Sequence, residues 1–238
     1  MAITPLQTVA DWPLLFRELA LSSHDERLQL FYAGGCPAAD TPLADVPFVA
    51  LDFETTGLDA EHDEIVSIGL VPFDLQRIRV RDARHWLLTP RKEMKENSVV
   101  IHGITHSDID GAPDLHSVMG ALLEAIAGRV VVVHYRYIER EFLNAGITRR
   151  VGEGIRFPVV DTMELEAQLY RKGFSSFCGR LLGRKPTSIR LGDSRSRYGL
   201  PHYAQHDAMV DALATAELLQ AQIRHRYSEN TPLSEIWI

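Results

Sequence analysis

One stretch, from Val49 to Gly57, constrains this chain most, because an apolar run there ends in two acids placed two positions apart. In a β-strand, side chains alternate between the two faces, so Asp52 and Glu54 point to one face while Phe53 points into the core. Carboxylates on one face repel each other unless a cation lies between them, and such oxygen ligands suit Mg²⁺ or Mn²⁺. At the turn that follows, Gly57 is free to adopt a positive φ. An isolated pair of this kind more often marks a solvated strand end, so a metal site requires further acids elsewhere in the chain.

The succession of apolar segments predicts an α/β fold with a mixed sheet. Strands are expected over residues 48–53, 64–72 and 77–88, where they form an antiparallel meander. Helices are then expected over 115–126, 137–144, 162–170 and 208–224, alternating with strands over 130–133 and 157–160. Gly146 is expected to end the second of these helices and Asp161 to cap the third. Three strands followed by this alternation are typical of a mixed sheet flanked by helices.

The two ends of the chain are expected to lie outside the main domain, which we place at residues 47–226. Residues 1–46 are expected to form a helical appendage with a linker, and residues 227–238 a C-terminal tail. The appendage could dock a partner or form a dimer. Trp12 and Phe16 favour a third arrangement, in which it covers the fold's own sheet, because these side chains need burial.

Composition limits the classes of protein to which the chain can belong. No apolar run reaches the roughly 18 residues of a membrane span, and Cys36 and Cys178, the only two cysteines, form no C-x-x-C pair. We therefore expect a cytoplasmic protein with no membrane contact and no zinc site. The net charge is −7, yet residues 171–197 hold eight Lys and Arg against one Asp, a local charge of +7. This basic segment predicts a surface for a phosphodiester substrate, or a solvated face that happens to be basic.

Three further segments carry histidines and acids. His134 ends an apolar run and precedes Glu139, His206 stands five positions before Asp211, and an irregular segment contains His102 followed by Gly-Ile. Together with the Asp-Phe-Glu-Thr-Thr-Gly stretch, these segments resemble the three motifs and the nucleotide-pocket segment of the DEDDh family of 3′→5′ exonucleases, the DnaQ-like group with an RNase H-like fold. The resemblance extends from the first strand to the last helix.

The resemblance implies a hydrolase that uses two divalent ions, Mg²⁺ or Mn²⁺, to release nucleoside 5′-monophosphates from the 3′ end of single-stranded DNA or RNA. By this resemblance Asp52 bridges both ions, Glu54 and Asp211 hold the ion that carries the attacking water, and His206 accepts the proton of that water. A histidine suits this role because imidazole titrates near neutral pH. His206 is expected in the loop before the last helix, since five positions along one helix would turn it away from Asp211.

The same resemblance implies substrate contacts at Thr55, Thr56, Gly57, His102, Ile104 and His134. The two threonines would offer backbone N–H groups to the terminal 3′-hydroxyl. For His134, a substrate contact and a bond that satisfies the strand end are equally open. A homodimer or a polymerase partner is also left open, because no partner-binding motif stands out.

Four polar residues near the motifs have simpler structural explanations. Asp161 and Asp207 are each expected to cap a helix N-terminus. Arg136 and Arg140 are expected on a solvated helix face, with contacts to substrate phosphates as the alternative.

Glu139 departs from the family pattern, which has an aspartate at this position. Glutamate keeps the carboxylate but adds one methylene, and Mg²⁺ requires strict octahedral geometry. The side chain can reach the site directly, act through a water with a preference for Mn²⁺, or leave the second ion weakly held. We expect activity to be retained, because the other four residues match. The alternatives are a nucleic-acid-binding or regulatory module with attenuated catalysis and a nuclease of short oligonucleotides.

Overall fold

The computed structural model describes residues 11–92, 99–100, 102–170, 186–204 and 206–238. Among these residues, five strands form one sheet in the order β3-β2-β1-β4-β5. Their bounds are Phe48–Thr55 (β1), Ile65–Phe73 (β2), Arg84–Leu87 (β3), Val130–Val133 (β4) and Val159–Asp161 (β5). The first three strands pair antiparallel, and β1, β4 and β5 pair parallel. The predicted mixed sheet is thereby confirmed.

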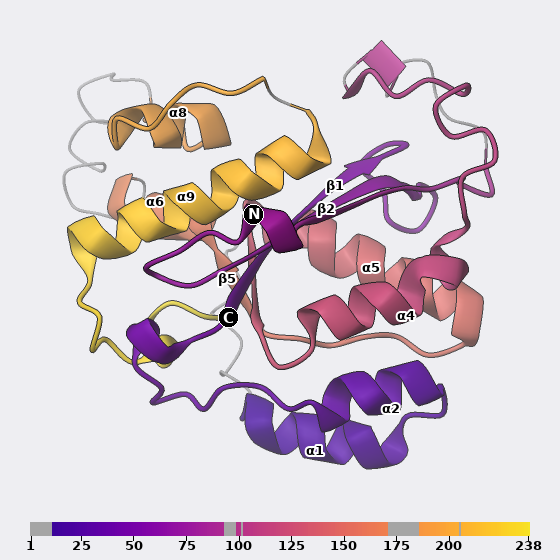
Figure 1. Cartoon of the computed structure of the whole chain (residues 1–238), viewed down its shortest axis with the longest axis horizontal. Helices are drawn as coiled ribbons and strands as arrows, with labels where there is room; N and C mark the ends of the chain where they lie inside the picture. Colours follow the sequence, from indigo (N-terminus) through magenta and orange to yellow (C-terminus); the bar gives the residue numbers. More distant parts are fainter. Residues whose placement is uncertain (1–10, 93–98, 101, 171–185, 205) are drawn as a thin grey trace.

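Helices cover both sides of the sheet (Figure 1). One side carries α4 (Leu115–Ile126) and α5 (Arg136–Val151), and the other carries α6 (Thr162–Tyr170), α8 (Leu191–Arg197) and α9 (Ala208–Arg226). Strand β2 is buried along its whole length, as expected for a strand covered on both faces. None of the described helices combines the length and the apolar composition that a membrane crossing needs.

The N-terminal segment forms two helices, α1 (Trp12–Ser22) and α2 (Glu26–Ala33), which lie beside α4 (Figure 1). Each begins at an aspartate that accepts a backbone N–H, Asp11 for α1 and Asp25 for α2. Trp12 and Phe16 are buried in the same apolar core as the sheet. Because α2 packs on α4, the pair extends the helical layer and does not cover the sheet directly, which corrects the expected arrangement. Residues 1–10 of the expected appendage lie outside the described part.

The expected linker and tail pack against each other. Leu43, in the short helix η1 (Leu43–Asp45), donates its backbone N–H to Thr231, and Leu233, in η3 (Leu233–Glu235), donates to Thr41. Trp237 then bridges to β5 and is buried. Both segments therefore contribute to the fold.

Two expected boundaries were wrong. The third strand was expected over 77–88, but β3 is shorter because the short helix η2 (Val80–Asp82) interrupts the segment. Helix α5 runs on through Gly146 to Val151. A Cβ atom on Gly146 would lie 2.7 Å from Leu115 Cδ2 of α4, so this glycine serves close helix packing and does not end the helix.

Gly69 of β2 allows a comparably close contact on the opposite side of the sheet. A Cβ atom built on Gly69 would lie 2.0 Å from the carbonyl oxygen of Ala208, the first residue of α9. No side chain fits in that space, so α9 begins directly against the sheet. Gly69 is the residue paired with Asp52 across the β1–β2 ladder.

Candidate active site

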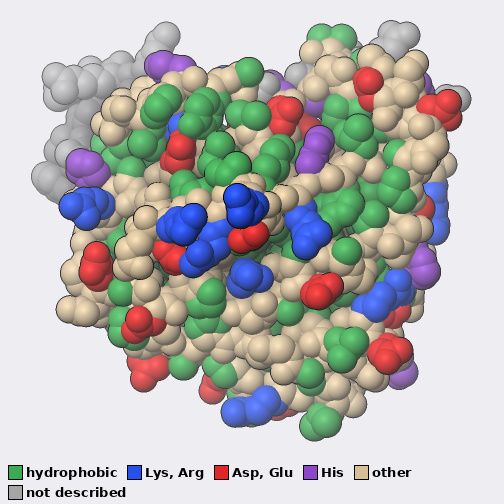
Figure 2. Space-filling view, in the orientation of Figure 1, with side chains coloured by type: hydrophobic (Ala, Val, Ile, Leu, Met, Phe, Trp, Pro, Cys, Tyr) green, Lys and Arg blue, Asp and Glu red, His purple; other side chains and the backbone are tan. Residues whose placement is uncertain are grey.

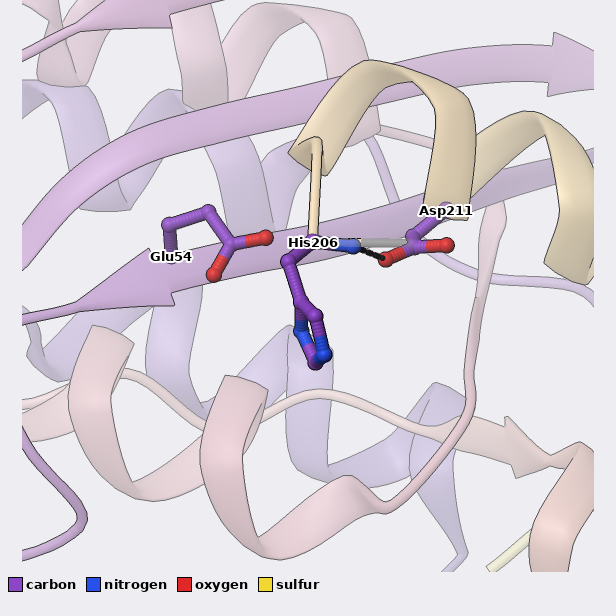
Figure 3. A group of neighbouring side chains, drawn as sticks. All are labelled: Glu54, His206 and Asp211. Carbon is purple, nitrogen blue, oxygen red and sulfur yellow. Dashed lines mark hydrogen bonds between the residues drawn. The ribbon is translucent and has the colours of Figure 1, made fainter. Parts of the chain in front are cut away.

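The β1 acids and the start of α9 come together at one end of the sheet. Glu54, His206 and Asp211 each offer one ligand atom, and these atoms all lie within 4.8 Å of one another. Figure 3 shows the Glu54 and Asp211 carboxylates facing each other with His206 between them. The close approach of α9 to Gly69 brings Asp211 to this position.

His206 lies in the loop immediately before α9. Its backbone N–H donates to Asp211 Oδ2 at 2.8 Å (Figure 3), and its φ of 68° is in the left-handed region that non-glycine residues seldom adopt. The next residue, Asp207, caps α9 by accepting from the N–H groups of Met209 and Val210 at 3.0 Å, as predicted. The loop is therefore held at both sides of His206 while the imidazole is exposed.

The acids of the site raise one another's pKa. Burial and the neighbouring carboxylates of Glu139, Asp211 and Glu54 raise the pKa of Asp52 well above its ordinary value. Burial, followed by the charge of Asp211, raises the pKa of Glu54 to about 7. Burial also raises the pKa of Asp211. Such mutual repulsion is relieved when a cation enters the cluster.

Glu139 of α5 lies near Asp52, whose pKa its charge raises. Its side chain is 3% exposed, and its Oε2 atom is buried with no hydrogen-bond partner. Burial, with a smaller contribution from Asp161, raises the pKa of Glu139. The charge of the Glu139 carboxylate in turn contributes to the raised pKa of Asp52. A buried carboxylate oxygen without a donor is a position that a bound cation can satisfy. Carboxylates with one imidazole form a donor set that fits a divalent ion.

Asp161 holds the beginning of the helix that carries Glu139. Its carboxylate accepts from the backbone N–H groups of Tyr135 and Arg136 at 3.2 and 3.1 Å, at the start of α5. It also accepts from Met163 N–H at 3.0 Å, as the predicted cap of α6. One buried side chain thus joins the N-termini of two helices, and only one of these roles was predicted.

Of the two threonines predicted to offer backbone N–H groups to substrate, Thr56 uses its own N–H inside the protein. Thr56 donates its backbone N–H to the Glu64 carbonyl at 2.9 Å, so this N–H is not free for a 3′-hydroxyl. Its hydroxyl donates to Asp63 Oδ1 at 3.2 Å inside the protein. The hydroxyl of Thr55 donates to the Gly57 carbonyl at 2.6 Å. Thr55 stays a predicted substrate contact through its backbone, whereas Thr56 shapes the turn.

Gly57 is required for space and not for its dihedral angle. The expected positive φ is absent at this residue. A Cβ atom on Gly57 would lie 2.2 Å from Asp63 Oδ2, so only glycine lets the Asp63 side chain fold back under the turn.

His102 and Ile104, both predicted to contact the nucleotide, differ in how many of their side-chain atoms are engaged by the protein. His102 accepts from Ile104 N–H through Nδ1 at 3.0 Å, and its Nε2 is buried without a partner. Burial and then the charge of His206 lower the pKa of His102, so the two imidazoles are neighbours. The Ile104 side chain packs on the small cluster of Val66 and Ile109. Both His102 and Ile104 stay predicted substrate contacts.

His134 is engaged by protein atoms on both ring nitrogens. Nδ1 lies 2.8 Å from Thr162 Oγ1, and Nε2 lies 3.1 Å from the Ile189 carbonyl oxygen. Burial lowers the pKa of His134 to about 4. This arrangement satisfies the strand end, the second of the two explanations left open above, and the substrate contact stays a prediction.

Arg136 and Arg140 of α5 are half-buried and held by protein atoms, so they are not free for phosphates. Arg136 Nη1 lies 3.2 Å from Asp161 Oδ2, and the guanidinium stacks over Tyr137 at 4.5 Å. Arg140 donates to the Phe157 carbonyl at 2.8 Å. Both expectations for these residues were wrong, because the side chains join α5 to its neighbours.

The basic segment 171–197 is likewise less available than its composition suggests. Arg195 is 3% exposed and pairs with Glu217 at 2.7 Å, and Arg197 pairs with the fully buried Glu166 at 2.6 Å. Residues 171–185 of this segment lie outside the described part. Within the described part, Arg190 is the segment's exposed arginine.

Motif reasoning missed the role of Gly69 and one of the two roles of Asp161. The signal for Gly69 was present, since glycine in a strand interior marks a close approach of another backbone. The second role of Asp161 had no signal in the sequence, because the N–H groups that it accepts from lie 25 and 26 positions away.

Comparison with known proteins gives this site a context. The sequence model of the exonuclease family (RNase_T) matches residues 49–219. DNA polymerase III subunit epsilon of Treponema pallidum is 32% identical over 185 residues, which are 78% of this chain and 80% of that protein. The PolC-type DNA polymerase III of Thermotoga maritima is 30% identical over 179 residues, 75% of this chain but 12% of that polymerase. The chain thus spans a small part of its PolC-type relatives.

Solved structures with the same fold include several nucleases. The nuclease domain of 3′hExo, a DEDDh family member bound to rAMP, aligns with a TM-score of 0.59 at 14% identity, covering 76% of this chain and 92% of that one. Exonuclease X in complex with 5′-overhanging duplex DNA aligns with a TM-score of 0.55 at 20% identity. The alignment covers 79% of this chain and 98% of that one. A zinc-bound complex of E. coli ExoI with single-stranded DNA aligns with a TM-score of 0.58 at 15% identity. The alignment covers 76% of this chain and 41% of that one.

Proposed function

The chain belongs to the DEDDh exonuclease family, and from that premise we propose that it is a metal-dependent 3′→5′ exonuclease acting on single-stranded DNA. The observation that carries the proposal is the meeting of Glu54, His206 and Asp211 within 4.8 Å. The half-buried Asp52 and the buried Glu139 supply the remaining acids near this group. DNA is favoured over RNA because relatives at 30% identity or more are named as DNA polymerase III proteins.

Asp52, Glu54 and Asp211 would hold two divalent ions, Mg²⁺ or Mn²⁺, which supply positive charge to the attacking and leaving oxygens of the phosphodiester. His206 accepts the proton of the attacking water at a ring nitrogen, which is available because its hydrogen bond to Asp211 uses the backbone N–H. The unpartnered Nε2 of His102 is offered to the terminal nucleotide. Glu139 Oε2 completes the acid cluster from the α5 side.

We propose three further features of the whole protein. Residues 47–226 form the exonuclease domain, with α1 and α2 as an appendage on α4. A polymerase is the proposed partner, because the named relatives are subunits or parts of DNA polymerase III. The cytoplasm is the proposed location, in keeping with the two isolated cysteines.

We expect purified protein to shorten 5′-labelled single-stranded DNA stepwise from its 3′ end in Mg²⁺ or Mn²⁺ and to leave it intact in EDTA. Removing the ions leaves repelling carboxylates that cannot bind the phosphate, so the activity should vanish and return when metal is restored. Gel electrophoresis of timed samples, with single-stranded RNA in parallel, measures both the direction and the preferred polymer. The Asp211→Asn variant controls for contaminating nucleases.

Three other outcomes of this experiment would each change the proposed function in a different way. Faster cleavage of RNA would reassign the substrate and keep the chemistry. Binding of DNA without a ladder in either metal would replace the exonuclease with the binding module, and cleavage confined to the shortest oligonucleotides would favour a nuclease of short oligonucleotides.

Glu139→Asp is expected to lower kcat/KM about tenfold and to raise the Mn²⁺ concentration needed for half-maximal activity. The Glu139 carboxylate lies close enough to Asp52 to raise its pKa, and the shorter side chain of aspartate withdraws the carboxylate by about one carbon–carbon bond. Steady-state kinetics across a metal titration measures both effects. Glu141→Asp is the matched control, because Glu141 lies on the same helix and is exposed. A gain of activity in Glu139→Asp would instead show that the native glutamate attenuates catalysis.

A further inference from the structure

We propose that Arg195 is a positioning residue for the hydrolysis step, because its guanidinium holds the segment that leads to His206 against α9. The inference rests on the proposed function, in which His206 accepts the proton of the attacking water. The exposed Lys and Arg side chains in the middle of the face drawn in Figure 2 are of the kind that a phosphate can reach. Arg195 is 3% exposed, so it acts through other residues and not through contact with the substrate.

Arg195 joins α8 to α9, which lie side by side (Figure 1). Its Nη1 donates to the Ala214 carbonyl at 2.6 Å, and its Nη2 donates to Glu217 Oε2 at 2.7 Å. Both partners belong to α9 and stand three and six positions after Asp211. A planar guanidinium fixes several acceptors in one geometry. Arg195 is therefore held on the helix that carries one of the acids of the site.

The same guanidinium also holds the residues before His206, which we call the approach segment (residues 199–204). Nη2 donates to the Pro201 carbonyl at 2.9 Å, and the guanidinium carbon lies 4.6 Å from the centre of the Tyr203 ring. The Tyr203 hydroxyl donates to Glu217 Oε1 at 3.0 Å, so one carboxylate receives both the guanidinium and the phenol. Two residues of the approach segment are thereby tied to α9, the second of them three positions before His206.

A narrow space lies between this arrangement and the acids. Its volume is about 20 Å³, which is room for about one water molecule, and its lining includes Arg195, Tyr203 and Asp211. On the acid side, Asp211 Oδ2 accepts the backbone N–H of His206 at 2.8 Å. His206 is thus tied to α9 directly at Asp211 and, through the approach segment, at Arg195. Its left-handed backbone conformation is of the kind that persists only where the surroundings impose it.

A purely structural role is the alternative, and Arg197 of the same helix shows what such a role involves. Arg197 donates to Glu166 Oε2 at 2.6 Å and to the Ser188 carbonyl at 2.7 Å. Its guanidinium carbon lies 4.7 Å from the centre of the Tyr170 ring. None of these three partners lies on α9 or in the approach segment. If Arg195 only stabilises the fold, replacing either arginine should have the same consequences.

The test compares Arg195→Lys with Arg197→Lys. Lysine keeps the positive charge but lacks the planar fork of donors, so it cannot serve all partners of the guanidinium. In Mn²⁺ and well below Tm, Arg195→Lys should lower kcat on single-stranded DNA about 10²-fold, because a displacement of about 1 Å in a catalytic group has an effect of that size. KM and the Mn²⁺ requirement should keep their wild-type values, since the start of α9 stays fixed by its contact with Gly69. Arg197→Lys should lower Tm and leave kcat unchanged.

The double variant Arg195→Lys/His206→Gln shows whether Arg195 acts through His206. Its kcat should equal that of His206→Gln alone, because the guanidinium has no base to position once the imidazole is gone. An equal fold-loss from Arg195→Lys in the presence and in the absence of His206 would overturn the inference. Equal kcat values for Arg195→Lys and Arg197→Lys would overturn it as well.

Hydrogen exchange in EDTA, followed by mass spectrometry, tests the contact without cleavage. Peptides that contain the approach segment and His206 should exchange at least about tenfold faster in Arg195→Lys, because hydrogen bonds of a buried charged group are lost. The same peptides should keep their wild-type rates in Arg197→Lys. Unchanged rates in Arg195→Lys would overturn the inference. If the wild-type protein cleaves no DNA, the proposed function fails, while the exchange rates still decide whether Arg195 holds this segment.

Discussion

Replacing Asp52 with asparagine is expected to lower kcat/KM on single-stranded DNA by at least about 10³-fold, because metal-supplied charge stabilisation is worth several kcal/mol in the transition state. The same replacement is expected to stabilise the metal-free protein. Asp52 is half-buried near Glu139, Asp211 and Glu54. Desolvation, followed by the repulsion of these three acids, raises its pKa, so the neutral amide removes an unfavourable charge. A rise in Tm of at least about 2 °C in EDTA corresponds to ~1 kcal/mol for a chain of this size. Activity and stability should therefore change in opposite directions.

Measuring stability against pH tests whether the carboxylates of the site are unfavourably charged in the metal-free protein. Burial raises the pKa of Glu54 from its ordinary 4.5 to about 7, so across this window the native metal-free protein binds more protons than the unfolded chain. Stability in EDTA should therefore fall as pH rises from 4.5 to about 7. Added Mn²⁺ should restore Tm in the wild-type protein and much less in Asp52→Asn. A lower Tm for Asp52→Asn in EDTA would contradict this account of the site.

Gly69→Ala is expected to lower kcat/KM about 10²-fold, since a displacement of about 1 Å in catalytic groups has an effect of that size. The added methyl group would lie 2.0 Å from the Ala208 carbonyl oxygen and 2.5 Å from Met209 N, which are backbone atoms that cannot rotate away. The start of α9 must shift, and Asp211 with the preceding His206 loop shifts with it. Overpacking of this kind also costs about 1–3 kcal/mol of stability. Kinetics at a temperature well below Tm and a Mn²⁺ binding titration measure the displacement separately from unfolding.

Gly120→Ala provides the matched control for this variant. Gly120 lies within α4, and a Cβ atom there would meet Arg27 Cδ at 3.7 Å, an ordinary contact distance. This replacement should stabilise the protein by about 0.5–1 kcal/mol, because glycine in a helix interior is unfavourable, and should leave activity unchanged. Wild-type metal affinity in Gly69→Ala would show that α9 is not positioned by this contact.

Local features of the fold were predictable because their causes lie within a few residues of each other. The β1 acids, the cap at Asp207 and the position of His206 before α9 each depend on neighbouring residues along the chain. The order of strands and helices followed from apolar periodicity for the same reason. Gly146 was misjudged because the space it vacates is filled by Leu115, a residue 31 positions earlier in the chain.

The sequence alone established the family, the mixed sheet and the acids and histidine that are candidates for chemistry. Only the tertiary structure decided which charges are free. Arg195 and Arg197 are neutralised by Glu217 and Glu166 on other helices, whereas no carboxylate in the described part of the chain pairs with the exposed Arg190. It also decided that the Glu139 carboxylate lies near enough to Asp52 to raise its pKa, since that depends on where α5 begins. These outcomes depend on distances between residues that are remote in the chain, and such distances exist only after the layers have packed.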